Sequence, residues 1–238
     1  MENFKNKFQD YLLLEKNYSH HTSLAYLADL NVFHNFIVKE FDQEDLLEVN
    51  YSQVRSWIVL LSDKGISNTS INRKISSLKA FYKFLLKVKQ IESSPLLKHK
   101  ALKTQKKLQI PFSEKELDAV LNQIPFMNGF EGVRDKLIID LFYSTGIRRT
   151  ELINLKLQNV DLSNNTIKVL GKRNKERLIP MLPNLKNQIK KYLIERSDIQ
   201  SISDKEFFFL LLNGVKMNDS FVYRIINYYF SNVSEKVK

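Results

Sequence analysis

The stretch KLQNVDLSNNTIKVLGKRNKERLIP, residues 156–180, sets the fold class, because its apolar residues follow a different period from those around it. Lys156–Leu162 and Thr166–Leu170 have the period of strands and flank Asn164-Asn165, a pair that is typical of hairpin turns. A second polar turn follows, and Arg177–Pro180 is predicted to be a third short strand. Since the flanking segments have the period of helices, we predict a small antiparallel sheet within a helical domain.

Helices are predicted on both sides of this sheet. The capping box Ser113-Glu114-Lys115-Glu116 begins a helix over residues 113–124. A second helix over 131–144 ends at Gly146, since glycine is suited to a helix C-terminus. The remaining elements are a short helix through Thr150–Leu155, helices over Pro183–Arg196 and Asp219–Tyr229, and a short buried strand or helix start at 206–212.

The first 90 residues have only the helical period, and they predict a compact all-helical domain. Its last helix carries an apolar stripe from Ile71 to Leu86, and its N-cap is expected within Asn68–Ser70. The predicted fold class is therefore mainly α with a small antiparallel β-sheet. Its parts are a helical domain over residues 1–90, a basic linker over 91–111 and a mixed domain over 112–238.

Composition excludes several classes of protein. The 238 residues include no cysteine, which excludes a disulfide scaffold and a thiolate metal site. The longest apolar run, Phe207–Leu212, is far shorter than the about 20 residues that span a bilayer. The N-terminal residues lack the apolar core and cleavage site of a signal peptide, so we expect a cytoplasmic protein without a membrane partner.

Positive charge is concentrated in the middle of the chain. Residues 64–115 hold 13 basic and 2 acidic side chains, and the net charge of the whole chain is +11. Such clustering is typical of a protein that binds a polyanion, and nucleic acid is the first expectation. Lys79, Lys83 and Lys87 are four residues apart and form a ridge on the last helix of the first domain. A solvated lysine-rich face or an anionic membrane would explain the charge as well.

The first motif that points to chemistry is YSTGIRRTELINL, residues 143–155. Arg148 follows the helix-ending glycine, and Glu151 lies three residues further on, where it can orient the guanidinium. The planar fork of an arginine can hold two phosphate oxygens, which a lysine cannot do. The alternative is an ordinary ion pair on the surface of a short helix.

The second motif is VLGKRNKERLIPM, residues 169–181. It places Lys172, Arg173 and Lys175 at the tip of a predicted hairpin. An ammonium group there can reach a phosphate oxygen, and a solvated hairpin turn is the alternative.

Together the two motifs resemble those of a known family. TGIRRTEL, followed by paired strands and then GKRNKERLIP, is similar to the catalytic domain of tyrosine recombinases of the Xer and phage-integrase type. The first part of the chain resembles the core-binding domain of that family, and the similarity extends to about residue 230. The matching residues of the first part are Ser23, Tyr26, Asp29-Leu30, Phe33, TSINRKISSLKAFYKFLL at 69–86 and Pro95.

The resemblance implies a site-specific DNA recombinase. In that family a tyrosine attacks a DNA phosphate and forms a 3′-phosphotyrosine, and neither a metal nor a cofactor takes part. By motif position Arg148 matches an arginine that stabilises charge on the phosphoryl oxygens, and Glu151 matches the acidic residue that supports it. Lys172 matches the hairpin lysine that acts as general acid, with Lys175 as the second choice. The DNA-binding residues that we expect are Arg73, Lys79, Lys83, Lys87, Arg149, Arg173 and Lys175.

The resemblance also implies the partners. We expect double-stranded DNA at a recombination site as a partner, with the two domains forming a clamp around the duplex. We also expect a homologous recombinase protomer, since the family acts as four protomers on two duplexes. For the Xer type this activity serves chromosome partition at cell division, and phage integration and mobile-element excision share the same catalytic core.

One part of the family pattern is missing from these 238 residues. The family has a His-x-x-Arg box, a further His or Trp and a nucleophilic tyrosine near its C-terminus, whereas the four histidines of this chain lie before residue 100. Tyr228 and Tyr229 are expected to be core residues of an apolar helix. We therefore expect a recombinase cut short before that box, whose residues bind DNA and are inactive alone.

Two further functions stay open. The chain can be a catalytically inactive DNA-binding regulator or accessory protein at recombination sites, which keeps the fold without the reaction. It can also be a helical interaction module with a basic face and no role on DNA. That last function explains the charge, but it does not explain the two motifs at their spacing.

Overall fold

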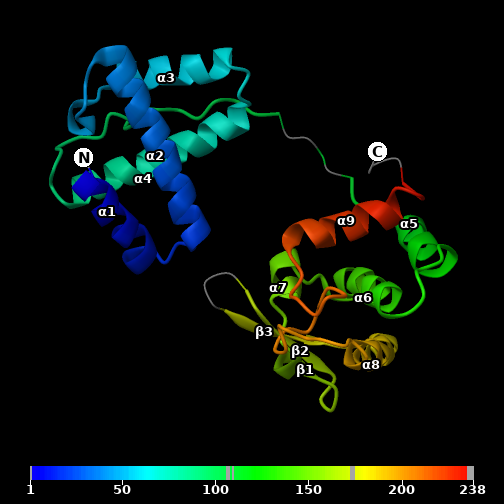
Figure 1. Cartoon of the computed structure of the whole chain (residues 1–238). Coiled ribbons are helices and arrows are strands. Elements are labelled where there is room, and N and C mark those ends of the chain that lie inside the picture. The colour runs from blue at the N-terminus through cyan, green and yellow to red at the C-terminus, as the bar shows by residue number, and fades with distance from the viewer. Residues whose placement is uncertain (1, 106–107, 109, 172–174, 235–238) are drawn as a thin grey trace. The chain divides into compact units, whose positions relative to one another are not determined.

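The computed structural model of the chain describes residues 2–105, 108, 110–171 and 175–234. It forms two compact units, Met1–Leu108 and Gln109–Lys238 (Figure 1). The described residues are mostly helical with a small three-stranded antiparallel sheet, so the predicted fold class is confirmed.

Helices make up the described secondary structure of the first unit. α4 (Asn68–Lys87) is capped by Ser67, whose side chain accepts a hydrogen bond from the amide of Ser70. The predicted position of this N-cap, within Asn68–Ser70, is therefore wrong by one residue. The other elements are α1 (Glu2–Asp10), the π turn η1 (Tyr11–Glu15), α2 (His20–Phe41), the 3-10 turn η2 (Leu46–Glu48) and α3 (Tyr51–Asp63).

The first unit closes around an aromatic core. The ring of Trp57 on α3 packs against that of Phe33 on α2, with ring centroids 4.9 Å apart, and both side chains are buried. Residues 91–105, which composition assigns to the linker, also pack against this unit. Leu96 is buried in the same cluster, and the side chain of Asn72 binds both the amide and the carbonyl of Leu102. This part of the basic segment therefore belongs to the first unit.

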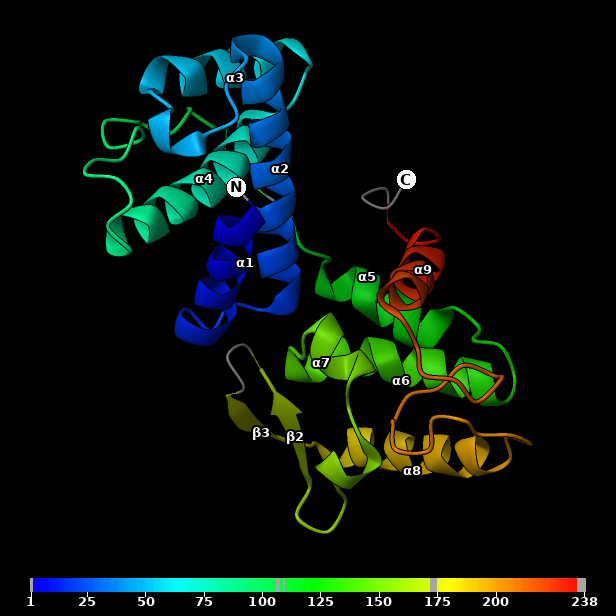
Figure 2. The same cartoon turned by 60° about the vertical axis from the view of Figure 1, so that its left-hand side comes forward.

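The second unit contains the sheet and the helices around it. The helices that hydrophobic period predicts here are confirmed, and their ends differ by a few residues. α8 lies alongside α6 in both views (Figures 1 and 2). The elements are α5 (Glu114–Asp118), the π turn η3 (Ala119–Gln123), α6 (Phe130–Thr145), α7 (Arg149–Ile153), the 3-10 turn η4 (Leu157–Asn159), β1 (Val160–Asp161), β2 (Thr166–Leu170), β3 (Glu176–Pro180), α8 (Pro183–Ser197) and α9 (Asp219–Phe230).

The sheet has the order β1-β2-β3, and each neighbouring pair is antiparallel. Buried and exposed side chains alternate along the end of β2, as the sequence predicts. The first predicted strand, Lys156–Leu162, is wrong over most of its length, because only Val160–Asp161 pairs with β2. The residues before it form the turn η4 instead, since the amide of Leu157 donates to the carbonyl of Glu206, 2.9 Å away.

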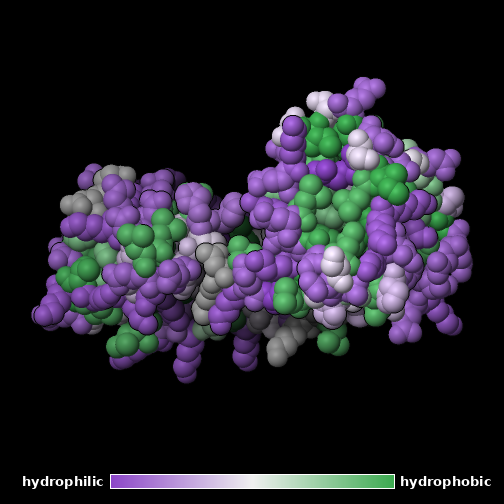
Figure 3. Space-filling model, turned by 90° about the horizontal axis from the view of Figure 1, so that it is seen from below, coloured by the Kyte–Doolittle hydropathy of each residue, from purple (hydrophilic) through white to green (hydrophobic). Residues whose placement is uncertain are grey.

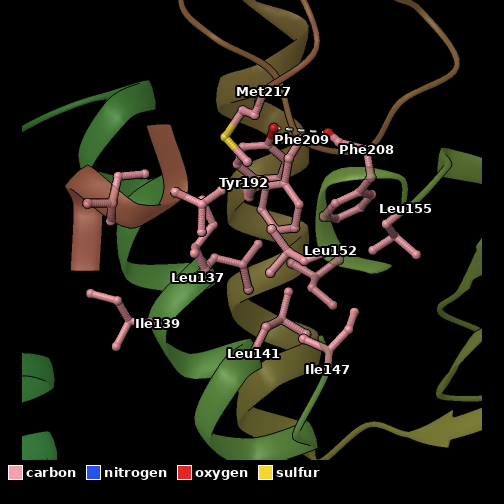
Figure 4. Packing of buried hydrophobic residues seen from close by; sticks show 14 of the residues in the cluster. Leu137, Ile139, Leu141, Ile147, Leu152, Leu155, Tyr192, Phe208, Phe209 and Met217 are labelled. Carbon is pink, nitrogen blue, oxygen red and sulfur yellow. Dashed lines mark hydrogen bonds between the residues drawn. The ribbon is translucent and has the colours of Figure 1, made fainter. Parts of the chain in front are cut away.

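The core of the second unit lies between α6, α7, α8 and the segment that follows α8 (Figure 4). Tyr192 of α8 is buried, and its hydroxyl donates to the carbonyl of Phe208 at 3.0 Å. The prediction of a strand or helix start at 206–212 is wrong, since this segment forms isolated bridges in place of a ladder or helix. Its carbonyl groups are bound by side chains, because Arg196 of α8 donates to Phe207 and Phe208.

The two hydrophobic clusters are internal. On the face that Figure 3 shows, hydrophilic residues cover most of the surface, and apolar residues form separate patches between them. In the described part of the chain, no helix combines the length and the apolar character that a bilayer span requires.

Candidate functional site

The chain reverses between α6 and α7, and this turn places Arg148. Gly146 ends α6 in the left-handed region, with φ 61° and ψ 25°, and its amide donates to the carbonyl of Phe142. Ile147 then enters the core, and its amide donates to Oγ1 of Thr145 at 3.2 Å. Arg148 consequently stands at the N-terminus of α7 on a well-bonded backbone.

Glu151 holds Arg148 from the inside of the unit. Its Oε2 accepts a hydrogen bond from the amide of Arg148 at 2.8 Å, and its Oε1 accepts one from Nη1 of the same residue at 2.9 Å. The side chain of Glu151 is 3% exposed, whereas that of Arg148 is 67% exposed. A buried carboxylate needs such donors, unlike the carboxylate of a surface ion pair. The pair therefore consists of a buried anchor and an outward-facing cation.

A second arginine binds the same carboxylate. Arg177, on β3, donates from Nη1 to Oε1 of Glu151 at 2.7 Å and from Nη2 to Oε2 at 2.8 Å. The planar guanidinium group is suited to this bidentate contact, in which two N–H groups donate in parallel. The hydrogen bonds from Arg177, followed by those from Arg148, outweigh burial and lower the pKa of Glu151 to about 2. Glu151 is therefore ionised at neutral pH.

The stem of the β2–β3 hairpin packs directly against this carboxylate. The amide of Gly171 donates to the carbonyl of Lys175 at 2.8 Å. A Cβ atom at Gly171 would lie 3.3 Å from that carbonyl oxygen and 3.4 Å from Oε1 of Glu151. A larger residue would therefore crowd the site, and the hairpin stem and the first turn of α7 meet at Glu151.

Arg148 keeps most of its hydrogen-bonding capacity. A guanidinium has five N–H groups, and within the described residues the side chain of Arg148 donates one hydrogen bond, to Glu151. The other groups lie on an exposed side chain of fixed charge and can hold two oxygens of one phosphate. In the same described ranges, no three metal-ligating side chains are grouped. The arrangement thus fits an anion that bears several oxygens.

The other predicted residues of the two motifs differ in what the structure describes of them. Lys172 and Arg173 lie outside the described residues, so their roles stay predictions. Lys175 is exposed beside them. Arg149, a predicted DNA contact, pairs with Asp219 of α9, with Nε 3.2 Å from Oδ1.

Arg73, a predicted DNA contact in the first unit, is held by Asp29 of α2. Its Nη1 and Nη2 donate to the two carboxylate oxygens at 2.7 and 2.8 Å. Asp29 also accepts hydrogen bonds from Lys74 and Ser77. Burial raises the pKa of Asp29, but these hydrogen bonds outweigh it and hold the pKa below its usual value. The fork of Arg73 thus links α4 to α2, and its contact with DNA stays a prediction.

The predicted lysine ridge of α4 faces solvent. Lys79, Lys83 and Lys87 are all exposed, as their spacing predicts. Nζ of Lys79 donates to the carbonyl of His99 at 3.4 Å, and Lys87 pairs with Glu15. Ammonium groups in a line can meet successive phosphates, so the ridge stays a predicted DNA contact with a solvated helix face as the alternative.

The two tyrosines near the end of α9 lie in different surroundings. Tyr229 is 2% exposed, which confirms its prediction as a core residue, and burial together with nearby Asp135 raises its pKa to about 12. The same prediction is wrong for Tyr228, which is 65% exposed. The side chains of neighbouring residues in a helix point about 100° apart, so only one of the two rings faces the core. Tyr229 is therefore protonated and buried at neutral pH.

Comparison with known proteins covers both units. Residues 6–89 match the family model described as "Phage integrase, N-terminal SAM-like domain", and residues 125–236 match the one described as "Phage integrase family". Tyrosine recombinase XerC from Staphylococcus epidermidis is 33% identical over 227 residues, which are 95% of this chain and 75% of the relative. The chain belongs to the tyrosine recombinase family. The resemblance that the motifs indicate is thereby confirmed.

Other comparisons agree with this membership. Tyrosine recombinase XerC from Listeria innocua is 34% identical over 232 residues, which are 98% of this chain and 76% of the relative. The Tn1549 transposon integrase in complex with transposon right end DNA has a TM-score of 0.73 at 19% identity, over 99% of this chain and 82% of that chain. XerH recombinase bound to difH substrate has a TM-score of 0.67 at 18% identity, over 96% and 68%. These two structures show the shared fold.

Arg177 is a site residue of this tyrosine recombinase that the sequence analysis missed, although the second motif contains it. The hairpin motif directs attention to the tip, and Arg177 is assigned only to a strand. A signal was present, because Arg177 and Ile179 are two residues apart on β3 and share a face, and Ile179 is buried. A guanidinium on the inner face of a strand needs an acidic partner, and Glu151 was available from the other motif.

Proposed function

We propose that these 238 residues are the DNA-binding part of a site-specific recombinase, and that Arg148 holds one phosphate of the duplex. The observation that carries the proposal is the exposed guanidinium of Arg148 on the buried, ionised Glu151. A guanidinium that a buried carboxylate already holds in place loses little conformational freedom when it binds a phosphate. Family membership supports the proposal. Among the structures of similar fold, the Tn1549 integrase is in complex with transposon right end DNA, and the XerH site-specific recombinase is bound to its difH substrate.

Basic side chains elsewhere supply the remaining affinity for the duplex in this proposal. The net charge of +11 and the 13 basic residues within 64–115 attract a polyanion in a salt-dependent way. The ridge of Lys79, Lys83 and Lys87 is exposed and suits phosphates rather than base edges. Arg73, Arg149, Arg173 and Lys175 are further proposed contacts.

Strand cleavage is divided among several groups in the proposed reaction. Arg148 stabilises the negative charge that develops on the phosphoryl oxygens. Lys172 is the proposed general acid toward the leaving 5′-oxygen, and Lys175 is the second choice. No histidine follows residue 100, so the His-x-x-Arg box is not among these residues. We therefore propose that the 238 residues bind without cleaving, and that a homologous recombinase protomer is their partner on DNA.

Duplex binding at several salt concentrations tests the first part of the proposal. The expected result is that log K falls linearly with log salt, by about 0.9 for each phosphate contact. An affinity that stays constant from low to moderate salt would contradict DNA binding through phosphates. Acidic protein or heparin that binds while duplex DNA fails to compete would favour an interaction module instead.

A covalent-trapping assay tests the second part. A nicked duplex that cannot religate accumulates a covalent protein–DNA product whenever a recombinase tyrosine attacks. We expect no such product from the 238 residues, and a product would overturn their proposed inactivity while leaving the proposed DNA binding intact. The mass of the protein made from its own locus then separates the alternatives, since a mass near 28.0 kDa favours a DNA-binding regulator at recombination sites.

A further inference from the structure

We infer that Arg177 is a positioning residue for the recombinase site: it holds Arg148 in its phosphate-binding position through their shared partner Glu151. The inference rests on the proposed function, in which Arg148 binds phosphate. It assigns to Arg177 of β3 a part in the site, whereas the sequence analysis assigns this residue only to a strand.

The pattern of hydrogen bonds on Glu151 carries the first step. Arg148 binds the carboxylate through one side-chain N–H and its own amide, so its guanidinium is attached at a single point. Arg177 binds both oxygens of Glu151 in parallel, at 2.7 and 2.8 Å, and thereby fixes the plane of the carboxylate. The position of the Arg148 guanidinium therefore depends on a carboxylate whose orientation Arg177 sets.

The chemistry of Arg177 carries the second step. Both of its terminal nitrogens already donate to Glu151, and its side chain is 38% exposed, against 67% for Arg148. Arg177 consequently has fewer N–H groups to offer a phosphate than Arg148 has. It acts on the phosphate through Glu151 rather than by direct contact.

The hairpin stem carries the third step. Arg177 pairs with Val169 in the ladder between β2 and β3, so the strand holds its backbone at a fixed register. Gly171 brings the same stem close to Glu151, since a Cβ atom at Gly171 would be in van der Waals contact with Oε1 of Glu151 and tight against the carbonyl oxygen of Lys175. Arg177 is thus presented by a rigid element, as a positioning group requires.

A side-chain NMR titration tests the link without DNA. The Nε–Hε signal of Arg148 reports the charge of Glu151, whose pKa of about 2 keeps the wild-type signal constant from neutral pH to about pH 3.5. In Arg177→Gln we expect the signal to titrate at a higher pH, toward the ordinary glutamate value, and Arg177→Lys should lie between the two. Lys168→Gln is the matched control, because Lys168 lies on the same hairpin and pairs with Glu176 instead.

Identical titrations of the Arg148 signal in the wild type and in Arg177→Gln would overturn the inference. Amide spectra of each variant establish that the second unit is folded. If Arg177→Gln does not fold, Arg177→Lys provides the comparison, because it keeps the charge and loses the fork.

A double-mutant cycle on duplex affinity then tests the consequence for binding. Arg177→Gln should weaken duplex binding by about fivefold in the wild type and leave it unchanged in an Arg148→Gln background, as expected for residues that act through one contact. An equal loss in both backgrounds would mean that Arg177 contacts DNA itself, and it would overturn the inference. If the wild type does not bind duplex DNA, the proposed function fails, whereas the titration still tests the link between Arg177 and Arg148.

Discussion

Asp29 in the first unit and Glu151 in the second are both buried carboxylates that accept hydrogen bonds from an arginine fork. Within the described residues, Asp29 receives its side-chain donors from α4, where Arg73 and Lys74 are adjacent and Ser77 lies one turn further on. Glu151 receives its donors from two elements that are distant in sequence, the start of α7 and β3. The two carboxylates have similar chemistry, but they connect different kinds of elements: Asp29 joins two helices, and Glu151 joins the start of a helix to a strand.

This difference shows how one interaction serves packing in one place and a ligand in another. At Asp29 the contact is bidentate, because both terminal nitrogens of Arg73 donate to the carboxylate and join α4 to α2. At Glu151 the bidentate contact comes from Arg177, and the side chain of Arg148 donates a single hydrogen bond. A cation held in this way keeps its place and its remaining donors, which a binding site for phosphate requires.

Substitution of Asp29 should have the largest effect on stability. Asp29→Asn leaves the charges of Arg73 and Lys74 without their counter-charge. Because the side chain of Arg73 is half exposed, the expected cost is about 3 kcal/mol, at the lower end of the range for breaking a buried pair. Trp57 is the single tryptophan of the chain and is buried in the first unit, so its fluorescence follows the unfolding of that unit in urea. An unchanged midpoint of the Trp57 transition would show that the cluster does not hold the first unit together.

The acid dependence of stability should distinguish the second cluster. The pKa of Glu151 is lower in the folded protein, at about 2, than its ordinary value of 4.5, so its stabilising effect is complete above about pH 5 and is lost as the pH falls toward 2. The free energy of unfolding should therefore lose up to about 3 kcal/mol over this range. In Glu151→Gln this part of the acid dependence should vanish, as measured by circular dichroism, while the Trp57 transition at neutral pH stays in place. Equal acid dependence in both proteins would contradict the proposed role of Glu151.

Substitution of Gly146, in the turn before Arg148, should have a smaller effect on stability. Gly146 has a φ of 61°, and a Cβ atom there would meet no heavy atom within 4 Å, so the cost of Gly146→Ala is conformational. We expect the second unit to lose about 1 kcal/mol. Ala substitution at Gly171 is the informative companion, since the Cβ would approach Glu151 there and should disturb the Arg148 signal as well. A Gly146→Ala variant of unchanged stability would show that α6 does not depend on this cap.

Arg148→Lys should have the smallest effect on stability. The side chain is 67% exposed and the charge is kept, so the free energy of unfolding should change by about 0.5 kcal/mol or less. Duplex binding should nevertheless weaken, because a lysine cannot reproduce the fork. A large loss of stability would show that Arg148 joins elements of the fold as Arg73 does, and it would remove the distinction between the two clusters.

The sequence predicted those features that depend on nearby residues. The period of the apolar residues predicted α6, α8 and α9, and the Ser113–Glu116 capping box has the expected hydrogen bonds. The pair of Arg148 and Glu151 followed from a spacing of three residues on a helix.

Features that depend on tertiary contacts were predicted poorly. Segment 206–212 has the composition of a strand, but the side chains of α8 bind its carbonyl groups and no ladder forms. Arg177 is 26 residues from Glu151 in the chain, and no local period connects them. The spacing in the sequence therefore revealed the outward-facing arginine of the site and not the arginine that orients it.

The salt dependence of duplex binding by the wild type and by Arg148→Gln tests the central claim most directly. If Arg148 holds a phosphate, the slope of log K against log salt should be smaller in the variant by about 0.9, with stability nearly unchanged. Lys168→Gln provides a control for the loss of one positive charge elsewhere on the second unit. Slopes that are equal for the wild type and Arg148→Gln would contradict the claim that this arginine binds the DNA backbone.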